Sequence, residues 1–279
     1  MADVSYREAL LRASSLLAKK GLEAESILYV FLRRKQWSTT QWLLHFQEAI
    51  PAADQEQLAT DVSALLDFVP PQYLLGYEEF CGHRFNVTKA TLIPRPETEE
   101  LVMAAIESFS PEEKIQVVDI GTGTGAIGLS VKLARPNWQV TVTDLSESAL
   151  KIAQENAENL QAEVDFCQGD TLEPVADLTI DLLLSNPPYI SESEWELMDE
   201  SVRRFEPKLA LFAKEDGLAI YRKLAQQAYE LLSERGQIFL EIGFAQGPAV
   251  QGLFQEAFPK KEVTIIKDMA GCDRIIHVK

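Results

Sequence analysis

Residues 116–134 join a short apolar stretch to a helical one through a glycine-rich turn. Residues 116–120 read QVVDI, which predicts a buried strand, and residues 126–134 have the apolar spacing of a helix. The glycines between them let the backbone bend sharply and let a ligand approach closely. A strand that runs through a tight turn into a helix is the first half of a β–α–β unit, so this segment predicts a parallel sheet.

The same alternation of short apolar stretches and helical patterns continues to the end of the chain. Strand-like segments lie at residues 139–144, 164–168, 181–185, 236–243, 262–268 and 273–279, and helical patterns lie at residues 148–160, 217–236 and 247–258. The last two strand-like segments have no helical pattern between them, which indicates a terminal hairpin. The chain is therefore predicted to have an α/β fold with a doubly wound, mostly parallel sheet of seven strands.

The N-terminal region follows a different pattern. Helical spacing is present at residues 6–21, 23–35, 39–49 and 53–69, which predicts a small helical bundle. β-favouring residues around Gly82 then predict a short hairpin. We therefore divide the chain into a helical bundle at residues 1–72, a linking hairpin at 73–91 and an α/β domain at 92–279. The bundle carries no catalytic pattern, so we expect it to dock a partner or to serve as a structural cap.

The formal net charge is −17, and it is concentrated outside the predicted bundle. Residues 1–72 carry seven basic against nine acidic side chains, whereas residues 73–279 carry nineteen against thirty-four. Such a field repels the phosphates of nucleic acid, whose binding needs Lys and Arg, and it favours a basic protein segment as a partner. The simpler alternative is that the acidic surface only keeps the protein in solution.

Cysteine and histidine are sparse. Three of each are scattered without the spacing of a zinc site, a disulfide framework or a histidine-dependent triad. We therefore expect no metal, and a reducing, cytoplasmic location. The chain has no run of about 18 apolar residues, so no membrane span is expected. The N-terminus has Asp3 and no continuous apolar stretch, which argues against a signal peptide.

The glycine-rich turn and the acid that follows it predict a cofactor site. Gly123, Gly125 and Gly128 have the GxGxxG spacing, and Asp144 ends the next strand nineteen residues after Gly125. A carboxylate at that position can accept hydrogen bonds from both hydroxyls of a ribose. These features indicate a cofactor that contains adenosine. They do not separate a nicotinamide dinucleotide from S-adenosylmethionine.

Two further acids favour S-adenosylmethionine. Asp119 lies just before the glycines, where a carboxylate suits a cationic amino or sulfonium group better than a pyrophosphate. Asp170 follows the third strand and could accept a hydrogen bond from an adenine amino group. The alternatives are that Asp119 only interacts with the dipole of the following helix, and that Asp170 is an ordinary turn residue.

Residues 186–189 read Asn-Pro-Pro-Tyr and end the fourth strand. Because proline lacks an N–H group and fixes φ, two prolines stop the strand and hold the carbonyl of Pro187 still. A substrate –NH₂ whose lone pair is delocalised needs two fixed acceptors, which the Asn186 side-chain oxygen and the Pro187 carbonyl can supply. Tyr189 offers a flat face for an amide or a base. The motif thus predicts methylation of a planar amino group without a histidine base, although a plain strand-ending loop is an alternative.

Four stretches resemble the HemK/PrmC family of release factor glutamine methyltransferases. They are the Asn-Pro-Pro-Tyr motif and residues 119–131, 92–102 and 71–85. The motif alone is shared with adenine-N6 methyltransferases, but its combination with residues 92–102 and a helical N-terminal region is highly specific. The resemblance covers essentially the whole chain. It implies a Rossmann-like class I fold and transfer of a methyl group from S-adenosylmethionine to N5 of glutamine in the Gly-Gly-Gln tripeptide of peptide chain release factors.

The resemblance also implies which residues act. It places the cofactor contacts on Gly121, Thr122, Gly123, Thr124, Gly125, Asp144, Asp170 and Thr171. We expect Asp119 and Asn186 to contact the cofactor as well. Its substrate clamp and catalytic positions fall on Asn186, Pro187, Pro188 and Tyr189. Some family members carry an aromatic residue where this chain has Thr171. We expect Arg95, Glu97 and Glu99 to form a wall near the methionine end of the cofactor, the alternative being a proline-flanked linker. We also expect Arg95 to bind the substrate.

Other functions stay open at this point. Adenine-N6 methylation of nucleic acid is disfavoured by the carboxylates that follow the motif at Glu192, Glu194, Glu196, Asp199 and Glu200. A binding protein without activity would not need both the cofactor elements and the amide clamp. A glutamine of a ribosomal protein would present the same amide as one of a release factor. We expect a monomer whose partner is a release factor, with no direct contact to nucleic acid or membrane.

Overall fold

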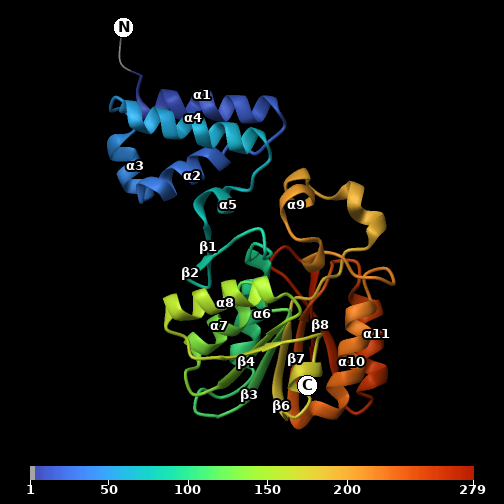
Figure 1. Ribbon diagram of the computed structural model, residues 1–279. Helices are drawn as coiled ribbons and strands as arrows, with labels where there is room; N and C mark the ends of the chain where they lie inside the picture. The colour runs from blue at the N-terminus through green and yellow to red at the C-terminus, as the bar shows by residue number, and fades with distance from the viewer. Residues whose placement is uncertain (1–3) are drawn as a thin grey trace. The chain divides into compact units, whose positions relative to one another are not determined.

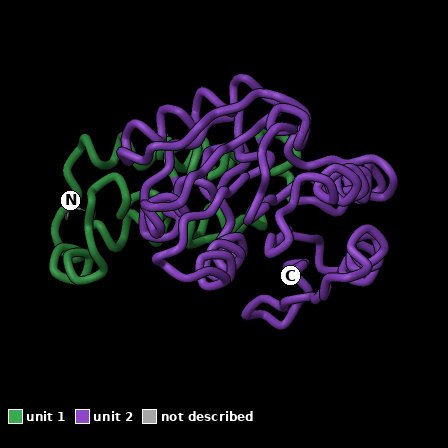
Figure 2. The backbone as a smooth tube through the Cα atoms, turned by 90° about the horizontal axis from the view of Figure 1, so that it is seen from below, with its two compact units in different colours: residues 1–77, 199–205 green, residues 78–198, 206–279 purple. Residues whose placement is uncertain are grey.

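The computed structural model describes residues 4–279 (Figure 1). Residues 1–3, which include Asp3 and the start of the predicted bundle, lie outside that range. The chain forms two compact units (Figure 2): one runs up to Tyr77 and includes Asp199–Phe205, and the other comprises Glu78–Met198 and Glu206–Lys279. Within residues 4–279, no helix is long and apolar enough to cross a membrane.

The first unit is helical. Serines begin two of its helices: Ser5 accepts a hydrogen bond from the Glu8 amide, and Ser38 forms a capping box with Gln41. Inside the unit, the guanidinium of Arg34 makes two hydrogen bonds to the carboxylate of Asp61, at 2.8 and 2.9 Å. The helices are α1 (Tyr6–Lys19), α2 (Ser26–Lys35), α3 (Thr39–His45), α4 (Ala52–Leu66), α5 (Pro71–Leu75) and the short α9 (Glu200–Phe205).

The second unit is built on a seven-stranded sheet within the described residues, with strand order β5-β4-β3-β6-β7-β9-β8. The first five strands in that order are parallel, and β9 is antiparallel to both of its neighbours. Strands β1 (Tyr77–Phe80) and β2 (His83–Asn86) form a separate hairpin. The large sheet consists of β3 (Gln116–Ile120), β4 (Gln139–Asp144), β5 (Asp165–Gln168), β6 (Ile180–Ser185), β7 (Leu232–Glu241), β8 (Val263–Lys267) and β9 (Asp273–Val278).

Helices cover both faces of this sheet, as the doubly wound prediction requires (Figure 1). On one face lie α6 (Pro96–Glu107), α7 (Ala126–Ala134) and α8 (Glu147–Leu160), and on the other lie α10 (Ala219–Leu231) and α11 (Gly247–Ala257). Short 3-10 turns occupy η1 (Glu173–Val175), η2 (Glu192–Leu197) and η3 (Lys208–Ala210).

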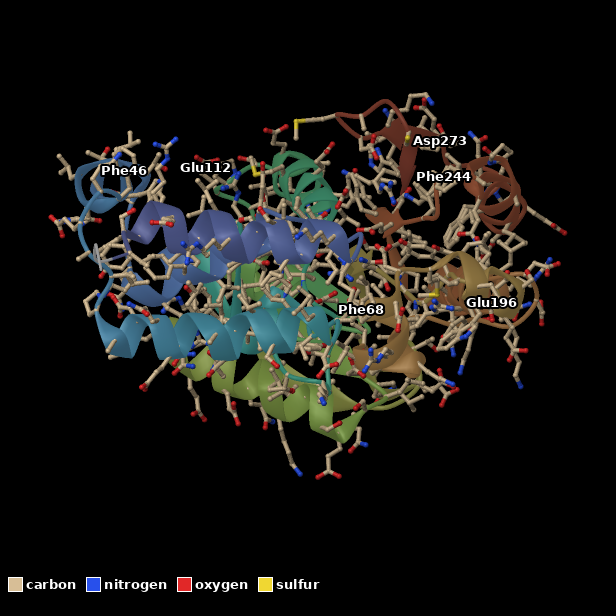
Figure 3. The ribbon with its side chains drawn as sticks, turned by 90° about the horizontal axis from the view of Figure 1, so that it is seen from above. Phe46, Phe68, Glu112, Glu196, Phe244 and Asp273 are labelled. Atoms are coloured by element: carbon tan, nitrogen blue, oxygen red, sulfur yellow. The ribbon has the colours of Figure 1, made fainter. Side chains whose placement is uncertain are left out.

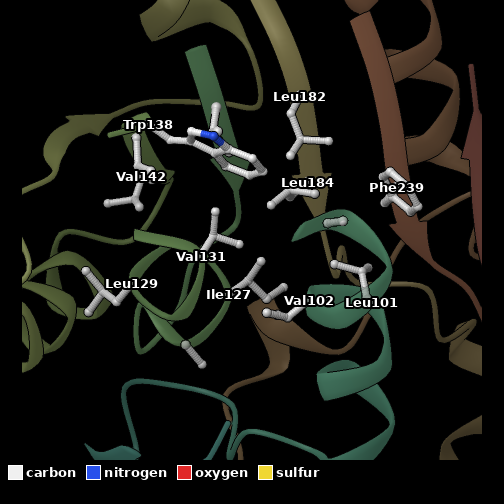
Figure 4. Packing of buried hydrophobic residues seen from close by; sticks show 14 of the residues in the cluster. Leu101, Val102, Ile127, Leu129, Val131, Trp138, Val142, Leu182, Leu184 and Phe239 are labelled. Carbon is white, nitrogen blue, oxygen red and sulfur yellow. The ribbon is translucent and has the colours of Figure 1, made fainter. Parts of the chain in front are cut away.

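Alternate residues of the central strands pack into two different cores. Leu182, Leu184 and Phe239 point toward the core under α6 and α7, where Trp138 is fully buried (Figure 4). Leu183, between the first two, points toward the core under α10 and α11. Because successive side chains of a strand point to opposite faces, a parallel strand covered on both sides must be apolar at every position, which explains the LLL run of β6.

The predicted fold class is confirmed, but some boundaries are wrong. Helix α6 is absent from the predicted pattern, although Pro96 at its first position and acids in its first turn are a typical helix start. The helix predicted at residues 217–236 ends at Leu231, and β7 begins at Leu232. There, Leu232 pairs with Ile180 of β6, so strand pairing overrides the helix preference of the local sequence.

Candidate active site

A cavity of about 360 Å³ lies where the carboxyl ends of β3, β4, β5 and β6 meet. Its walls are residues that follow those strands, together with parts of 89–98 and 207–212. This is where open parallel sheets bind ligands, because the loops after neighbouring strands diverge and leave a crevice. The second unit alone supplies all of these residues.

Two glycines of the turn present bare backbone to this cavity. Gly121 and Gly123 line it, and their φ angles of 68° and 56° lie in the left-handed region that favours glycine. A Cβ atom at either position would meet no atom within 4 Å, so it would project into open space that a ligand can use. The neighbouring Thr122 and Thr124 also line the cavity.

Gly125 has a different reason to be glycine. It is the N-cap of α7, with φ 84°, and a Cβ atom there would stand 2.7 Å from the Cδ1 atom of Leu129. The residue thus allows close packing of the turn on the helix. Since Gly125 is not among the residues that line the cavity, the structure does not support its predicted contact with the cofactor.

Asp119 is fully buried beneath the turn and does not line the cavity. Its Oδ2 atom accepts hydrogen bonds from the Thr122 hydroxyl at 2.5 Å and from the Gly128 amide at 3.0 Å, while its Oδ1 atom has no partner among residues 4–279. Burial raises the pKa of Asp119 to about 7, although both hydrogen bonds lower it. In the structure these two hydrogen bonds let Asp119 hold the turn and the start of α7, and its contact with the cofactor stays a prediction.

Asp144, the acid predicted to bind a ribose, stands at the end of β4 and lines the cavity. Its Oδ2 atom accepts from the Gly123 amide at 2.9 Å and its Oδ1 atom from the Ser146 amide at 2.8 Å. These bonds fix the carboxylate, and each oxygen keeps a lone pair for a ligand hydroxyl. Burial raises the pKa of Asp144, while the backbone amides oppose that shift.

Asp170 and Thr171 also line the cavity. Lys223 forms an ion pair with Asp170, with 2.7 Å between Nζ and Oδ2. Thr171 has φ 54°, and its hydroxyl donates to the side-chain carbonyl of Gln227 at 2.7 Å. Both side chains are thus held by α10, a contact that the sequence did not reveal.

Asn186, Pro187 and Pro188 line the cavity beside the glycine turn, because β6 pairs directly with β3. The Asn186 Nδ2 atom donates to the Thr98 hydroxyl at 3.2 Å, and that hydroxyl donates to the Glu241 carboxylate at 2.6 Å. Since the amide nitrogen of Asn186 is engaged in this way, its oxygen is the group left to accept a hydrogen bond from a ligand.

Tyr189 borders the cavity without lining it. Its ring packs on the core under α10 and α11, and its carbonyl accepts from the Gln246 side chain at 3.0 Å. Burial raises the pKa of Tyr189 to about 12, so the phenol stays neutral near neutral pH. The flat wall predicted for this residue is not part of the cavity in the structure.

Of the three residues predicted as a wall, only Arg95 lines the cavity. Its guanidinium is paired with the buried Glu206, at 2.5 Å. Glu97 is exposed, and Glu99 accepts a hydrogen bond from the Cys81 amide at the hairpin. These two glutamates do not line the cavity, and their predicted place near the methionine end of the cofactor stays a prediction.

Sequence reasoning missed three polar residues at or beneath the site. Thr98 and Glu241 form the chain to Asn186 described above. Asn156, on α8, donates to the Thr124 carbonyl at 2.9 Å and exchanges hydrogen bonds with the backbone of Asn86, so it ties the glycine turn to the hairpin. Glu241 could have been found, since it ends a strand as Asp144 does.

Comparisons with known proteins agree with this architecture. The family model of the PrmC N-terminal domain matches residues 8–76, and that of the methyltransferase small domain matches residues 100–213. A release factor glutamine methyltransferase of Enterococcus faecalis is 54% identical over 270 residues, which cover 97% of each chain. The one of Lactococcus lactis is 46% identical over 253 residues, which cover 90% of this chain and 92% of that protein.

Among solved structures, a methyltransferase from Pyrococcus furiosus superposes with a TM-score of 0.53 and 19% identity, covering 70% of this chain and 86% of that one. At this identity the likeness concerns the fold alone.

Proposed function

This chain belongs to the release factor glutamine methyltransferase family, and we propose that it transfers a methyl group from S-adenosylmethionine to the side-chain amide nitrogen of the glutamine in the Gly-Gly-Gln tripeptide of peptide chain release factors. The product is N5-methylglutamine in a protein that acts in translation termination. The observation that carries this proposal is the amide oxygen of Asn186, held ready to accept a hydrogen bond at the edge of the cavity.

The residues of the cavity suit the methyl donor. When bound, S-adenosylmethionine supplies an electrophilic methyl group. Gly121 and Gly123 leave room for it at the turn, and the fixed carboxylate of Asp144 can accept the hydrogen bonds of a ribose. Asp170 and Thr171 line the cavity at the end of β5, where the adenine would bind.

The chain's task in the reaction is to orient a poor nucleophile. The lone pair of a glutamine amide is delocalised into its carbonyl, and the –NH₂ group has two hydrogens to donate. The Asn186 side-chain oxygen can accept one, and the Pro187 carbonyl can accept the other. Two fixed acceptors hold the nitrogen in one orientation and stabilise the positive charge that develops on it. Once alkylated, the nitrogen is acidic and releases its proton without a histidine base.

The charge around the motif favours a protein over nucleic acid. Glu192, Glu194 and Glu196 are exposed on η2, directly after the motif, and Figure 3 labels Glu196 at the surface. These carboxylates would repel a phosphate backbone. We therefore propose a basic segment of a release factor as the partner of this surface, and no direct contact with nucleic acid.

We assign the docking of the release factor to the helical unit, whose sequence matches the PrmC N-terminal domain. In this proposal residues 1–72 recognise the body of the substrate and residues 92–279 carry out the transfer, with the hairpin at 73–91 as the link. The enzyme works as a monomer in the cytoplasm, where release factors act.

A panel of substrates tests this function. Purified protein and S-adenosylmethionine are incubated with a release factor, with the same factor carrying Gln→Asn in the tripeptide, with a ribosomal protein that contains an accessible glutamine, and with an oligonucleotide that contains adenine. Methyl transfer to the unaltered release factor alone is expected. Modification of the oligonucleotide, with none of the release factor, would contradict the proposal.

A further inference from the structure

Three elements of the second unit bring a short hydrogen-bond chain to the motif. Glu241 ends β7, Thr98 lies in the first turn of α6, and Asn186 follows β6. Their contacts are 2.6 Å between Thr98 Oγ1 and Glu241 Oε2, and 3.2 Å between Asn186 Nδ2 and Thr98 Oγ1. Thr98 is 4% exposed and Glu241 is 2% exposed, so water does not compete for these bonds.

The direction of this hydrogen-bond chain follows from which of its groups can donate a hydrogen bond and which can only accept one. An ionised carboxylate only accepts hydrogen bonds, and a hydroxyl has a single proton to give. If Thr98 gives that proton to Glu241, its oxygen can only accept from Asn186. The Nδ2 group of Asn186 must then face Thr98, because the flipped amide would place two acceptor oxygens against each other.

We propose that Glu241 and Thr98 are positioning residues that select the side-chain orientation of Asn186 and so direct its oxygen toward the substrate amide. This inference rests on the function proposed above. Neither residue needs to touch the substrate. Their effect is on the fraction of enzyme in which the acceptor is correctly placed before the substrate binds.

The protonation state of Glu241 then controls the motif. Burial raises the pKa of Glu241 to about 7, while the Thr98 hydrogen bond and Arg274 lower it. A protonated carboxyl can itself donate to Thr98, and the direction of the chain is lost. The other groups that face Glu241 are Glu97 and Arg95 at the start of α6, Tyr189 after the motif, and Tyr221 of α10, whose hydroxyl donates to the Glu241 carbonyl at 2.7 Å.

The two tyrosines do not titrate near neutral pH. Burial raises the pKa of Tyr189 to about 12 and that of Tyr221 well above its usual value. Within the hydrogen-bond chain of Glu241, Thr98 and Asn186, the ionisable group is Glu241, and its charge is expected to change between pH 6 and pH 8.

Two variants of Thr98 distinguish the effect of its hydroxyl group on catalysis from the effect of its side-chain packing. Thr98→Val keeps the shape and removes the hydroxyl, so we expect kcat to fall about tenfold while KM for S-adenosylmethionine and for the release factor stays within about twofold. Thr98→Ser restores the hydroxyl and is expected to restore most of kcat. The matched control is Thr141→Val, because Thr141 is also buried and also accepts from a side-chain amide, at 3.1 Å from Gln116, but lies outside the cavity.

A second readout does not depend on turnover. The side-chain NH₂ signals of Asn186 are followed by NMR in the free protein with asparagine-selective labelling, and assigned with Asn186→Asp. In the wild type we expect the Asn186 side-chain hydrogens to exchange slowly with water above pH 7. We expect their signals to change with pH along a titration curve with an apparent pKa near 7, the value for Glu241. In Thr98→Val and Glu241→Gln this titration is expected to disappear.

The outcomes are distinct. Loss of kcat and of the Asn186 titration in Thr98→Val, with recovery in Thr98→Ser, supports the inference. A wild-type kcat in Thr98→Val, or an Asn186 signal that titrates there as in the wild type, overturns it. An equal loss in Thr141→Val would show a general packing effect and also overturns it. If the wild type fails to methylate the release factor, the proposed function fails, and the NMR titration still decides on the hydrogen-bond chain.

Discussion

Three acids at or near the ends of sheet strands, two of them buried and Asp144 half-buried, hold the candidate site together. Asp119 holds the glycine turn, Asp144 faces the cavity, and Glu241 contacts Thr98 beneath the motif. In each case burial opposes ionisation, and the pKa is raised. Between the ordinary pKa of each acid in the unfolded chain and its raised pKa in the folded protein, the folded protein binds more protons than the unfolded chain. Stability therefore falls as pH rises through that range.

For Glu241 this range extends from the ordinary value of 4.5 to about 7. Glu241→Gln removes the titrating group, so the variant should not lose this stability as pH rises. The free energy of unfolding of the variant minus that of the wild type should therefore increase by roughly 2–3 kcal/mol between pH 4.5 and pH 8. Urea unfolding of both proteins across this range measures the difference. A constant difference at all pH values would mean that Glu241 does not titrate there.

A substitution of Asp144 tests the proposed contact with the ribose of the cofactor. Asp144→Asn keeps one acceptor oxygen but loses the charge, so we expect the Kd for S-adenosylmethionine to rise at least about tenfold, as measured by calorimetry. Asp165→Asn is the control, because Asp165 is an exposed acid on the neighbouring strand β5. Equal Kd values for the wild type and Asp144→Asn would exclude the ribose contact.

At the scale of elements, α8 locks the cofactor turn to the β1–β2 hairpin through Asn156. The side chain accepts from the Asn86 amide at 2.7 Å and donates to the carbonyls of Asn86 and Thr124, at 3.1 and 2.9 Å. It is 1% exposed, so its removal would leave backbone groups without partners.

Asn156→Ala is therefore expected to lower the free energy of unfolding by about 2–4 kcal/mol and to weaken cofactor binding, since Thr124 belongs to the turn. Thermal unfolding and cofactor titration measure the two effects. The control, Asn159→Ala, lies on the exposed face of the same helix. If both variants were equally stable, the turn would not depend on this clamp.

Local signals explain which elements could be predicted from the sequence. The bounds of β3, α7 and β4 match their sequence patterns, because strand, glycine turn and helix are each encoded within a few residues. The start of β7 could not be read in this way, because its pairing partner Ile180 lies far away in the sequence. The same reason applies to two of the acids predicted to contact the cofactor. Asp144 lines the cavity whereas Asp119 is buried beneath it, and no local sequence pattern reveals this difference in burial.

For the molecule as a whole, charge is expected to govern association with the substrate. Residues 73–279 carry nineteen basic against thirty-four acidic side chains, and three of the acids are exposed on η2. A basic partner would be attracted over a distance of about 8–10 Å at ordinary ionic strength.

We therefore expect KM for a release factor to rise several-fold as salt increases from about 0.05 M to 0.3 M, while KM for S-adenosylmethionine changes little. Replacing Glu192, Glu194 and Glu196 by glutamine should flatten the first dependence, as steady-state kinetics at several salt concentrations would show. A KM for the release factor that is independent of salt would argue against electrostatic attraction at this surface.

The central claim is that Asn186 and Pro187 present one glutamine amide for methylation. Tandem mass spectrometry of a release factor, after reaction with S-adenosylmethionine and either the wild type or Asn186→Ala, tests it most directly. We predict a single methyl group on the side-chain nitrogen of the Gly-Gly-Gln glutamine with the wild type, and almost none with the variant although it still binds the cofactor. A methyl group on another residue, or an unmodified glutamine, would contradict this account.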